Sequence, residues 1–85
     1  MRLIRDELDL HRLTVAEALP VLEEFLYAAY QAGLYSVRVI HGKGTGVLRR
    51  EVGRCLANHP LVKSHNPADR YHGGIGATQV ELSEW

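Results

Sequence analysis

A glycine-rich turn between an apolar segment and an amphipathic segment is the feature that most constrains the fold of this chain. The turn spans residues 41–46 (HGKGTG) and follows residues 37–40, an apolar run typical of a buried strand. Residues 46–57 then repeat apolar side chains at helical spacing. In such strand–turn–helix units the glycines let the backbone approach an anion, and the helix N-terminus offers free N–H groups. The sequence therefore predicts a phosphate-binding turn in a domain that mixes strands and helices.

Patterns on either side of the turn predict the remaining elements. Residues 7–11 alternate polar and apolar side chains, as a half-buried strand does. Thr14 and Glu17 have the spacing of a capping box, and the helix that they open is expected to end near Gly33. Further strands are predicted at residues 35–40, 61–65 and 77–82, with a polar loop at residues 66–76.

This order, βαβαββ, predicts a two-layer α/β (α+β) sandwich. Strand–helix–strand units favour parallel neighbours, and the last two strands can pair as an antiparallel hairpin. Two helices are too few to cover both faces of a sheet, so we expect a four-stranded mixed sheet with two helices mainly on one face. We expect a lead-in segment at residues 1–6 and the domain at residues 7–85.

Composition narrows the class of protein. The single cysteine, Cys55, excludes an internal disulfide and favours a reduced, cytoplasmic setting. No apolar run is long enough to span a bilayer, so no membrane partner is expected. The formal net charge is zero, but residues 1–31 carry a net −3 and residues 32–70 a net +5. The positive charge gathers around the glycine turn and the following helix, which is a modest phosphate-backbone footprint.

Asp9 and His11 are the first candidates for chemistry. In a continuous strand they would lie on one face, about 7 Å apart along the chain. An acid near a histidine can orient its ring and raise its basicity, as in a general base. Ligands gather at the carboxyl ends of parallel strands, where the glycine turn also lies. The alternative is that both side chains are merely solvated on an open face.

The glycine turn also has a purely structural alternative, which is tight packing of a strand against a helix. It matches neither the Walker loop nor the dinucleotide-binding fingerprint, so a nucleotide cofactor is not expected. The arginines of the next helix, Arg49, Arg50 and Arg54, could equally be a solvated surface. The histidines and the cysteine have no paired spacing for zinc, and the metal is left unassigned.

Four motifs, taken in order, resemble the Smr (small MutS-related) domain. They are LDLH at residues 8–11, LTVAEA at 13–18, HGKGTGVLR at 41–49 and GGIGAT at 73–78. The resemblance implies a fold similar to the C-terminal domain of translation initiation factor three. It also implies an endonuclease that nicks DNA with little sequence preference, linked to DNA repair or suppression of recombination. The family occurs alone or as the C-terminal module of a bacterial MutS-like ATPase of the recombination-suppressing type, and some members cleave RNA or act on stalled ribosomes. Arg12 stands where the family often has glycine, and adds a cation.

The motifs and the resemblance together predict phosphodiester hydrolysis at one sheet edge. The expected catalytic residues are Asp9, His11, His41 and Lys43, with His11 as base or acid, His41 as the complementary proton donor or acceptor, and Lys43 stabilising charge on the phosphate. The expected nucleic-acid-binding residues are Arg12, Gly42, Gly44, Thr45, Gly46, Arg49, Arg50 and Arg70.

The substrate is left open between DNA (branched or double-stranded) and RNA. RNA supplies its own 2′-hydroxyl nucleophile, whereas DNA needs a water that a divalent ion such as magnesium or manganese often activates. The alternatives are an RNA endonuclease, or a non-catalytic module that binds nucleic acid or the ribosome beside a MutS-like ATPase dimer. A domain that binds only protein would show neither activity.

Overall fold

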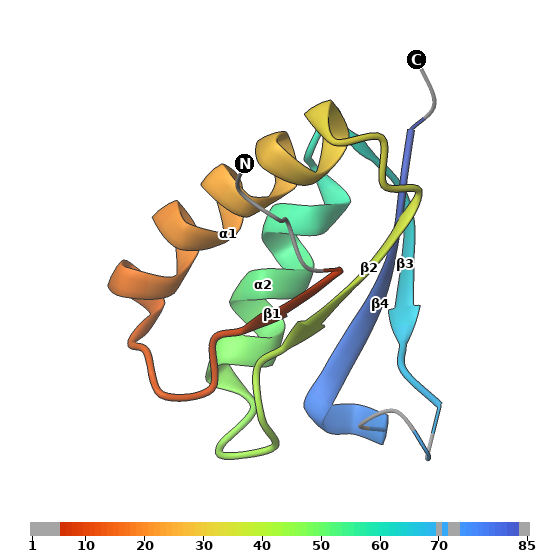
Figure 1. Ribbon diagram of the computed structural model, residues 1–85. Coiled ribbons are helices and arrows are strands. Elements are labelled where there is room, and N and C mark those ends of the chain that lie inside the picture. The colour runs from red at the N-terminus through yellow and green to blue at the C-terminus, as the bar shows by residue number, and fades with distance from the viewer. Residues whose placement is uncertain (1–5, 70, 72–73, 84–85) are drawn as a thin grey trace.

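The computed structural model describes residues 6–69, 71 and 74–83, and within them the predicted βαβαββ sandwich is confirmed. The elements are β1 (Glu7–Asp9), α1 (Val15–Gln31), β2 (Ser36–Ile40), α2 (Val47–Ala57), β3 (Val62–Pro67), the short 3-10 helix η1 (Gly74–Gly76) and β4 (Ala77–Leu82). Both α-helices lie on the same face of the sheet (Figure 1). The predicted loop at residues 66–76 is shorter than expected, because β3 runs on to Pro67 and η1 closes the loop.

The sheet order is β1-β2-β4-β3, so the last strand in the sequence lies between two earlier ones. β1 and β2 are parallel, and β4 is antiparallel to both β2 and β3, as the predicted hairpin requires. The expectation that β2 and β3 are neighbours is wrong. β3 is largely polar and ends in Pro67, which lacks the N–H that a central strand must donate, so it occupies an edge. The more apolar β4 takes the centre.

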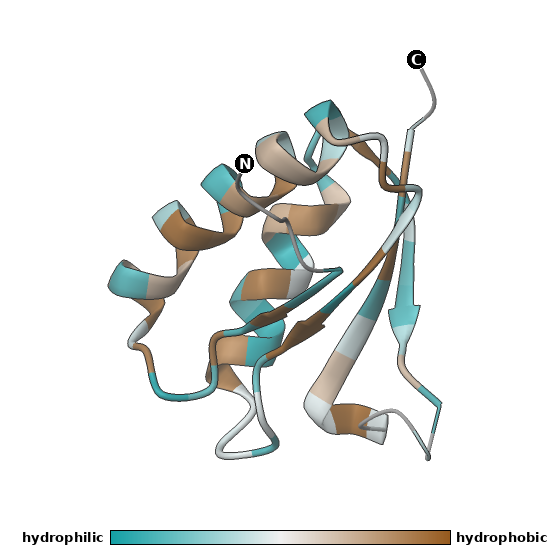
Figure 2. Ribbon diagram, viewed as in Figure 1, coloured by the Kyte–Doolittle hydropathy of each residue, from teal (hydrophilic) through white to brown (hydrophobic). Residues whose placement is uncertain are grey.

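The core fills the space between the sheet and the helices. Val37 and Val39 of β2 point toward the helices and are fully buried, and Val80 and Leu82 of β4 do the same. The core side chains that they meet come from both helices and from the end of β1: Leu10, Ala18, Leu22, Leu26, Ala29, Val52 and Leu56. Hydrophobic segments, brown in Figure 2, occur in both helices and in the strands. Val47, the first apolar residue of the repeat at residues 46–57, does not join this core. It is 44% exposed, because it is the first residue of α2, where the helix leaves the glycine turn.

Local hydrogen bonds in the structure form the helix ends that the sequence predicts. Thr14 is the N-cap of α1: the Glu17 N–H donates to the Thr14 hydroxyl (3.2 Å), and the Thr14 N–H donates to the Glu17 carboxylate (3.0 Å). Gly33 follows the C-cap with a left-handed φ of 79°. α1 includes Pro20 and still continues to Gln31. No helix in the part of the chain that the structure describes is long and apolar enough to cross a membrane.

The lead-in predicted at residues 1–6 lies outside the described residues except for Asp6. The Asp6 carbonyl accepts the Arg38 N–H (2.8 Å), so this residue already belongs to the pairing of β1 with β2. Among the described residues, the pairing with β2 thus extends one residue before β1. We call the face of the sheet that carries no helix the open face.

Candidate active site

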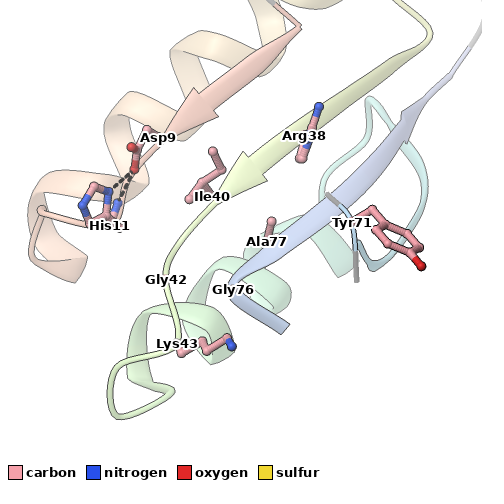
Figure 3. Close-up of a pocket in the computed structure, with 9 residues that line it drawn as sticks. All are labelled: Asp9, His11, Arg38, Ile40, Gly42, Lys43, Tyr71, Gly76 and Ala77. Atoms are coloured by element: carbon pink, nitrogen blue, oxygen red, sulfur yellow. Dashed lines mark hydrogen bonds and ion pairs between the residues drawn. The ribbon is translucent and has the colours of Figure 1, made fainter. Parts of the chain in front are cut away.

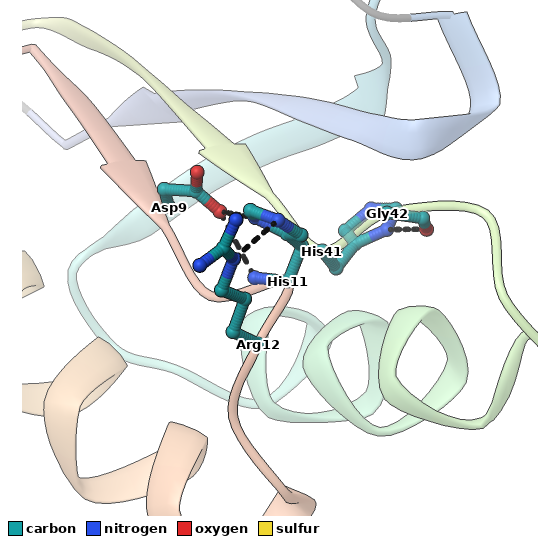
Figure 4. A network of polar contacts seen from close by, with 5 residues as sticks. All are labelled: Asp9, His11, Arg12, His41 and Gly42. Carbon is teal, nitrogen blue, oxygen red and sulfur yellow. Dashed lines mark hydrogen bonds and ion pairs between the residues drawn. The ribbon is translucent and has the colours of Figure 1, made fainter.

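The Asp9–His11 pair is formed by a turn at the end of β1. β1 ends at Asp9, and the Leu10 N–H still donates to the Ile40 carbonyl (2.6 Å) before the chain bends away. The Asp9 carboxylate then accepts the backbone N–H of His11 (3.0 Å) and the Nδ1–H of the His11 ring (Figure 4). The expectation that the two residues lie along one strand, about 7 Å apart, is therefore wrong. The side chain of Asp9 ends the strand by bonding to the backbone two residues on, and this brings the ring onto the carboxylate.

This contact lowers the pKa of Asp9 and selects the tautomer of neutral His11. The hydrogen bond from the His11 side chain, followed by the one from the His11 backbone, lowers the pKa of Asp9, so Asp9 is a carboxylate at neutral pH. A carboxylate only accepts hydrogen bonds, so Nδ1 of His11 carries the proton and neutral His11 keeps a lone pair on Nε2. The Arg12 Nε–H points at that lone pair (3.4 Å). Asp9 thus fixes the ring in the tautomer whose Nε2 is basic, and this nitrogen can act on a substrate once the Arg12 side chain turns away from it.

His41 is placed differently from His11. Its side chain is buried, with Nδ1 donating to the Gly42 carbonyl (3.0 Å) and Nε2 hydrogen-bonded to the Thr78 hydroxyl (2.9 Å). The backbone N–H groups of His41 and Gly42 both donate to the Gly76 carbonyl (3.0 and 2.9 Å). His41 therefore ties the start of the glycine turn to the start of β4. Proton transfer by His41 stays a prediction.

Glycines in the turn allow it to lie directly against His11. Gly42 has a left-handed φ of 76°, and a Cβ there would stand 3.2 Å from the Cβ of His11. Gly46 is the N-cap of α2 with a φ of 86°, and no side chain caps the helix there. The Val47 N–H donates to the Thr45 hydroxyl (3.5 Å), so the first N–H of the helix already has a partner. The turn therefore combines a close approach to His11 with a helix N-terminus whose N-cap residue has no side chain.

A cleft on the open face of the sheet joins these features. It has a volume of about 530 Å³ and runs from the end of β1 across β2 to the start of β4 (Figure 3). The predicted residues Asp9, His11, Gly42 and Lys43 line it. The lining residues that sequence reasoning missed are Arg38, Ile40, Tyr71, Gly76 and Ala77. A second hollow of about 370 Å³, lined by Asp9, His11, Arg12 and Leu13, shares the Asp9–His11 pair, so Arg12 approaches the pair from the other side.

The remaining predicted binding residues lie outside this cleft. Gly44, Thr45 and Gly46 continue the turn to α2, and their backbones do not line it. Arg50 and Arg54 are exposed and pair with Glu51 (3.4 and 3.7 Å). Arg49 lines a separate hollow with His65 and Thr78. Arg70 lies outside the described residues. The structure thus separates the arginines of α2 from the cleft that contains Asp9 and His11.

The described residues do not form a preformed metal site. Among residues 6–69, 71 and 74–83, no group of three or more His, Cys, Asp and Glu side chains is close enough to hold one ion. Asp9 and His11 are together, but the carboxylate is already engaged by the ring and the backbone of His11. The donor set present does not match a resident magnesium or manganese ion, which would need additional oxygen ligands.

Comparison with known proteins gives the family. The Smr domain model matches residues 8–83. The chain is 44% identical to endonuclease MutS2 of Clostridium tetani over 82 residues (96% of this chain) and 48% identical to endonuclease MutS2 of Thermomicrobium roseum over 79 residues (93%). In each case it spans 10% of the relative's length.

Solved structures agree with this assignment. The crystal structure of the Smr domain of Thermus thermophilus MutS2 is 43% identical, with a TM-score of 0.89 over 91% of this chain and 96% of that one. YdaL, a stand-alone small MutS-related protein from Escherichia coli, is 33% identical, with a TM-score of 0.88 over 93% of this chain and 65% of that one. The motifs, the fold and the relatives agree, and this chain belongs to the Smr domain family.

Proposed function

We propose that this domain is an endonuclease that nicks DNA with little sequence preference, using the Asp9–His11 pair. The observation that carries the proposal is the orientation of His11. An ionised Asp9 holds its ring in the tautomer that leaves Nε2 basic, in a cleft that also presents Lys43. The relatives' name, endonuclease MutS2, supports nuclease activity for the longer proteins that contain such a domain.

In the proposed reaction His11 takes a proton and Asp9 stabilises the charge that results. A water molecule attacks the phosphorus while Nε2 of His11 accepts the water's proton. The bond from phosphorus to the leaving oxygen breaks, and that oxygen takes a proton from solvent. Asp9 stabilises the imidazolium through the Nδ1–H contact. Lys43, which lines the same cleft, stabilises the negative charge on the phosphate oxygens.

The proposal gives His41 a positioning role. Its ring is buried and bonded through both nitrogens, so it would have to leave Thr78 and Gly42 to reach a substrate. Held as it is, it fixes the turn that carries Gly42 and Lys43. Arg12 binds a phosphate oxygen beside Nε2, and Arg49 and Arg50 contact the nucleic-acid backbone farther from the reaction. Arg70, which lies outside the described residues, stays a predicted backbone contact.

One observation favours RNA as a second candidate substrate. No three-ligand metal group exists among residues 6–69, 71 and 74–83, and a 2′-hydroxyl needs only a base such as His11 to become a nucleophile. We also propose a cytoplasmic role in DNA repair or suppression of recombination, with a MutS-like ATPase dimer as partner in a longer chain. The alternative role is action on the ribosome.

A nicking assay separates these functions. Supercoiled DNA and an RNA of matching sequence are incubated with the domain, with and without chelator. We expect nicked circles from the wild type, none from His11→Ala, and wild-type rates from Glu24→Gln on the exposed surface of α1. Cleavage of RNA alone that survives chelator selects the RNA reaction. Binding without cleavage of either polymer contradicts the proposed enzyme and selects a binding module.

A further inference from the structure

Arg38 lies in the middle of the open sheet face with part of its side chain unused. Its Nη2 pairs with the Glu7 carboxylate (3.3 Å). Its Nε is buried and has no hydrogen-bond partner among the described residues. Arginine donates best in pairs of parallel N–H bonds to a carboxylate or a phosphate. The Arg38 side chain is 26% exposed and lines the cleft that contains Asp9 and His11, so the exposed end of its guanidinium can bond a phosphate oxygen there in addition to Glu7.

The floor of the cleft beside Arg38 is apolar. Ile40 of β2 and Ala77 of β4 are directly paired across the two central strands, and both line the cleft between Arg38 and Lys43. An apolar floor cannot bond phosphate oxygens, but it suits the flat face of a nucleobase. Phosphate and base contacts are thus separated along this face: Lys43 and Arg38 supply charge, and the space between them offers an apolar contact.

Tyr71 completes the wall on the side of β4. It belongs to the connection between β3 and η1, lines the cleft, and is 86% exposed (Figure 3). Its backbone N–H donates to the Asp69 carboxylate (2.9 Å). Exposed aromatic rings next to cationic side chains are the usual platforms for unpaired bases, because every base has a face that can stack.

We infer that Arg38, Tyr71 and the Ile40–Ala77 floor form a subsite for one unpaired nucleotide next to the bond that is cut. The inference rests on the proposed nuclease function and adds the form of its substrate. The base lies on the floor against Tyr71, its phosphate bonds Arg38, and the neighbouring phosphodiester reaches His11 and Lys43. In a duplex the base faces are stacked on one another and cannot make this contact, so a strand with an unpaired nucleotide is preferred.

Acidic residues limit the length of this subsite. Toward the other end of β2 the open face carries Glu7, paired with Arg38, and Glu81, which accepts a hydrogen bond from Ser36 (3.2 Å). These carboxylates repel a phosphate backbone that continues past Arg38. The strand therefore has to leave the sheet after Arg38, and the contact is confined to the nucleotide beside the reacting phosphate.

Binding measurements with and without bases test the subsite. Fluorescence anisotropy is measured at low salt for three probes: an oligothymidylate of about twelve nucleotides, an abasic oligomer of equal length, and the matching duplex. We expect Tyr71→Leu to weaken oligothymidylate binding about tenfold and to leave binding of the abasic oligomer unchanged. Tyr71→Phe keeps the ring and should bind both probes as the wild type does. Arg38→Gln should weaken both single-stranded probes about tenfold, with Arg38→Lys in between.

Matched controls separate the subsite from general effects. Arg54→Gln removes the same charge on α2, and Tyr35→Leu removes an exposed tyrosine at the far end of β2; both should bind as wild type. In the cleavage assay, Arg38→Gln and Tyr71→Leu should raise KM more than they lower kcat. Equal binding of oligothymidylate and abasic oligomer by the wild type, or tighter binding of the duplex, overturns the inference even if nicking is found. Base-dependent binding without nicking supports the subsite and contradicts only the proposed enzyme.

Discussion

Replacing Asp9 by asparagine tests the proposed chemistry with the smallest change in shape. The amide occupies the volume of the carboxylate but carries no charge, and its NH₂ group can face the ring instead of its oxygen. The ring would then carry its proton on Nε2, which could no longer accept one from the nucleophile. In the wild type the carboxylate accepts both the backbone and the ring N–H of His11 and fixes the other tautomer.

The expected loss follows from the exposure of the pair. A general base contributes about 10²- to 10⁴-fold to a rate. The Asp9 side chain is 52% exposed and that of His11 43%, so water screens the interaction and the lower end applies. We expect kcat to fall about 10²-fold, or about 2.7 kcal/mol in activation free energy, with KM little changed.

The assay is the initial rate of nicking of supercoiled DNA at saturating concentrations, with circular dichroism to check the fold. Glu24→Gln makes the same chemical change on the exposed surface of α1 and should keep the wild-type rate. A kcat for Asp9→Asn within about threefold of wild type, with an unchanged pH profile, would refute the view that Asp9 orients a catalytic His11.

Three further predictions concern the turn, the buried histidine and the first helix. Gly42→Ala should lower the free energy of unfolding by about 1–3 kcal/mol and reduce cleavage, because φ is 76° and the new Cβ would press on His11; urea unfolding checks this, and Gly53→Ala in α2, where a new Cβ meets no atom within 4 Å, should keep the cleavage rate. His41→Ala should lower the free energy of unfolding by about 2–4 kcal/mol, because it leaves a cavity and an unpaired Thr78 hydroxyl; unchanged urea unfolding would contradict the positioning role. The Thr14 N–H and hydroxyl lower the pKa of Glu17 in the folded state. The stability that ionised Glu17 gives the fold is therefore complete above the ordinary pKa of 4.5, and it is lost as the pH falls through the lowered folded pKa. The thermal midpoint of Glu17→Gln should therefore lie below that of the wild type at neutral pH and converge with it in acid.

Local patterns predicted the elements because the forces that form them are local. The capping box of Thr14 and Glu17 and the alternation that ends in Val80 and Leu82 involve residues a few positions apart, and both are found in the structure. The end of β1 was mispredicted for an equally local reason. Alternation alone continues the strand to His11, but the Asp9 side chain bonds the His11 N–H and turns the chain.

The spacing of residues along β2 already indicated that His41 is buried, although its place in the glycine-rich turn suggested a catalytic role. Val37 and Val39 of β2 and His41, the residue after β2, are each two positions apart. A strand that buries the two valines therefore points His41 toward the helices as well. Its partner Thr78 is 37 residues away and no short-range pattern connects them. Arg38 and Tyr71 were missed because their meeting depends on the strand order. Only when β4 lies beside β2 does the segment before β4 bring Tyr71 to the face that carries Arg38.

The central position of β4 also determines when the site can exist. A chain emerging during synthesis presents β1, β2 and β3 before the strand that joins β2 to β3 has been made. Until residues 76–78 arrive, the glycine turn lacks the Gly76 carbonyl that holds its backbone and the Thr78 hydroxyl that holds His41. An incomplete chain therefore carries the Asp9–His11 pair, which its own turn forms, without the frame that positions the turn of Lys43. If the domain cleaves nucleic acid as proposed, it can do so only once β4 has been added to the chain.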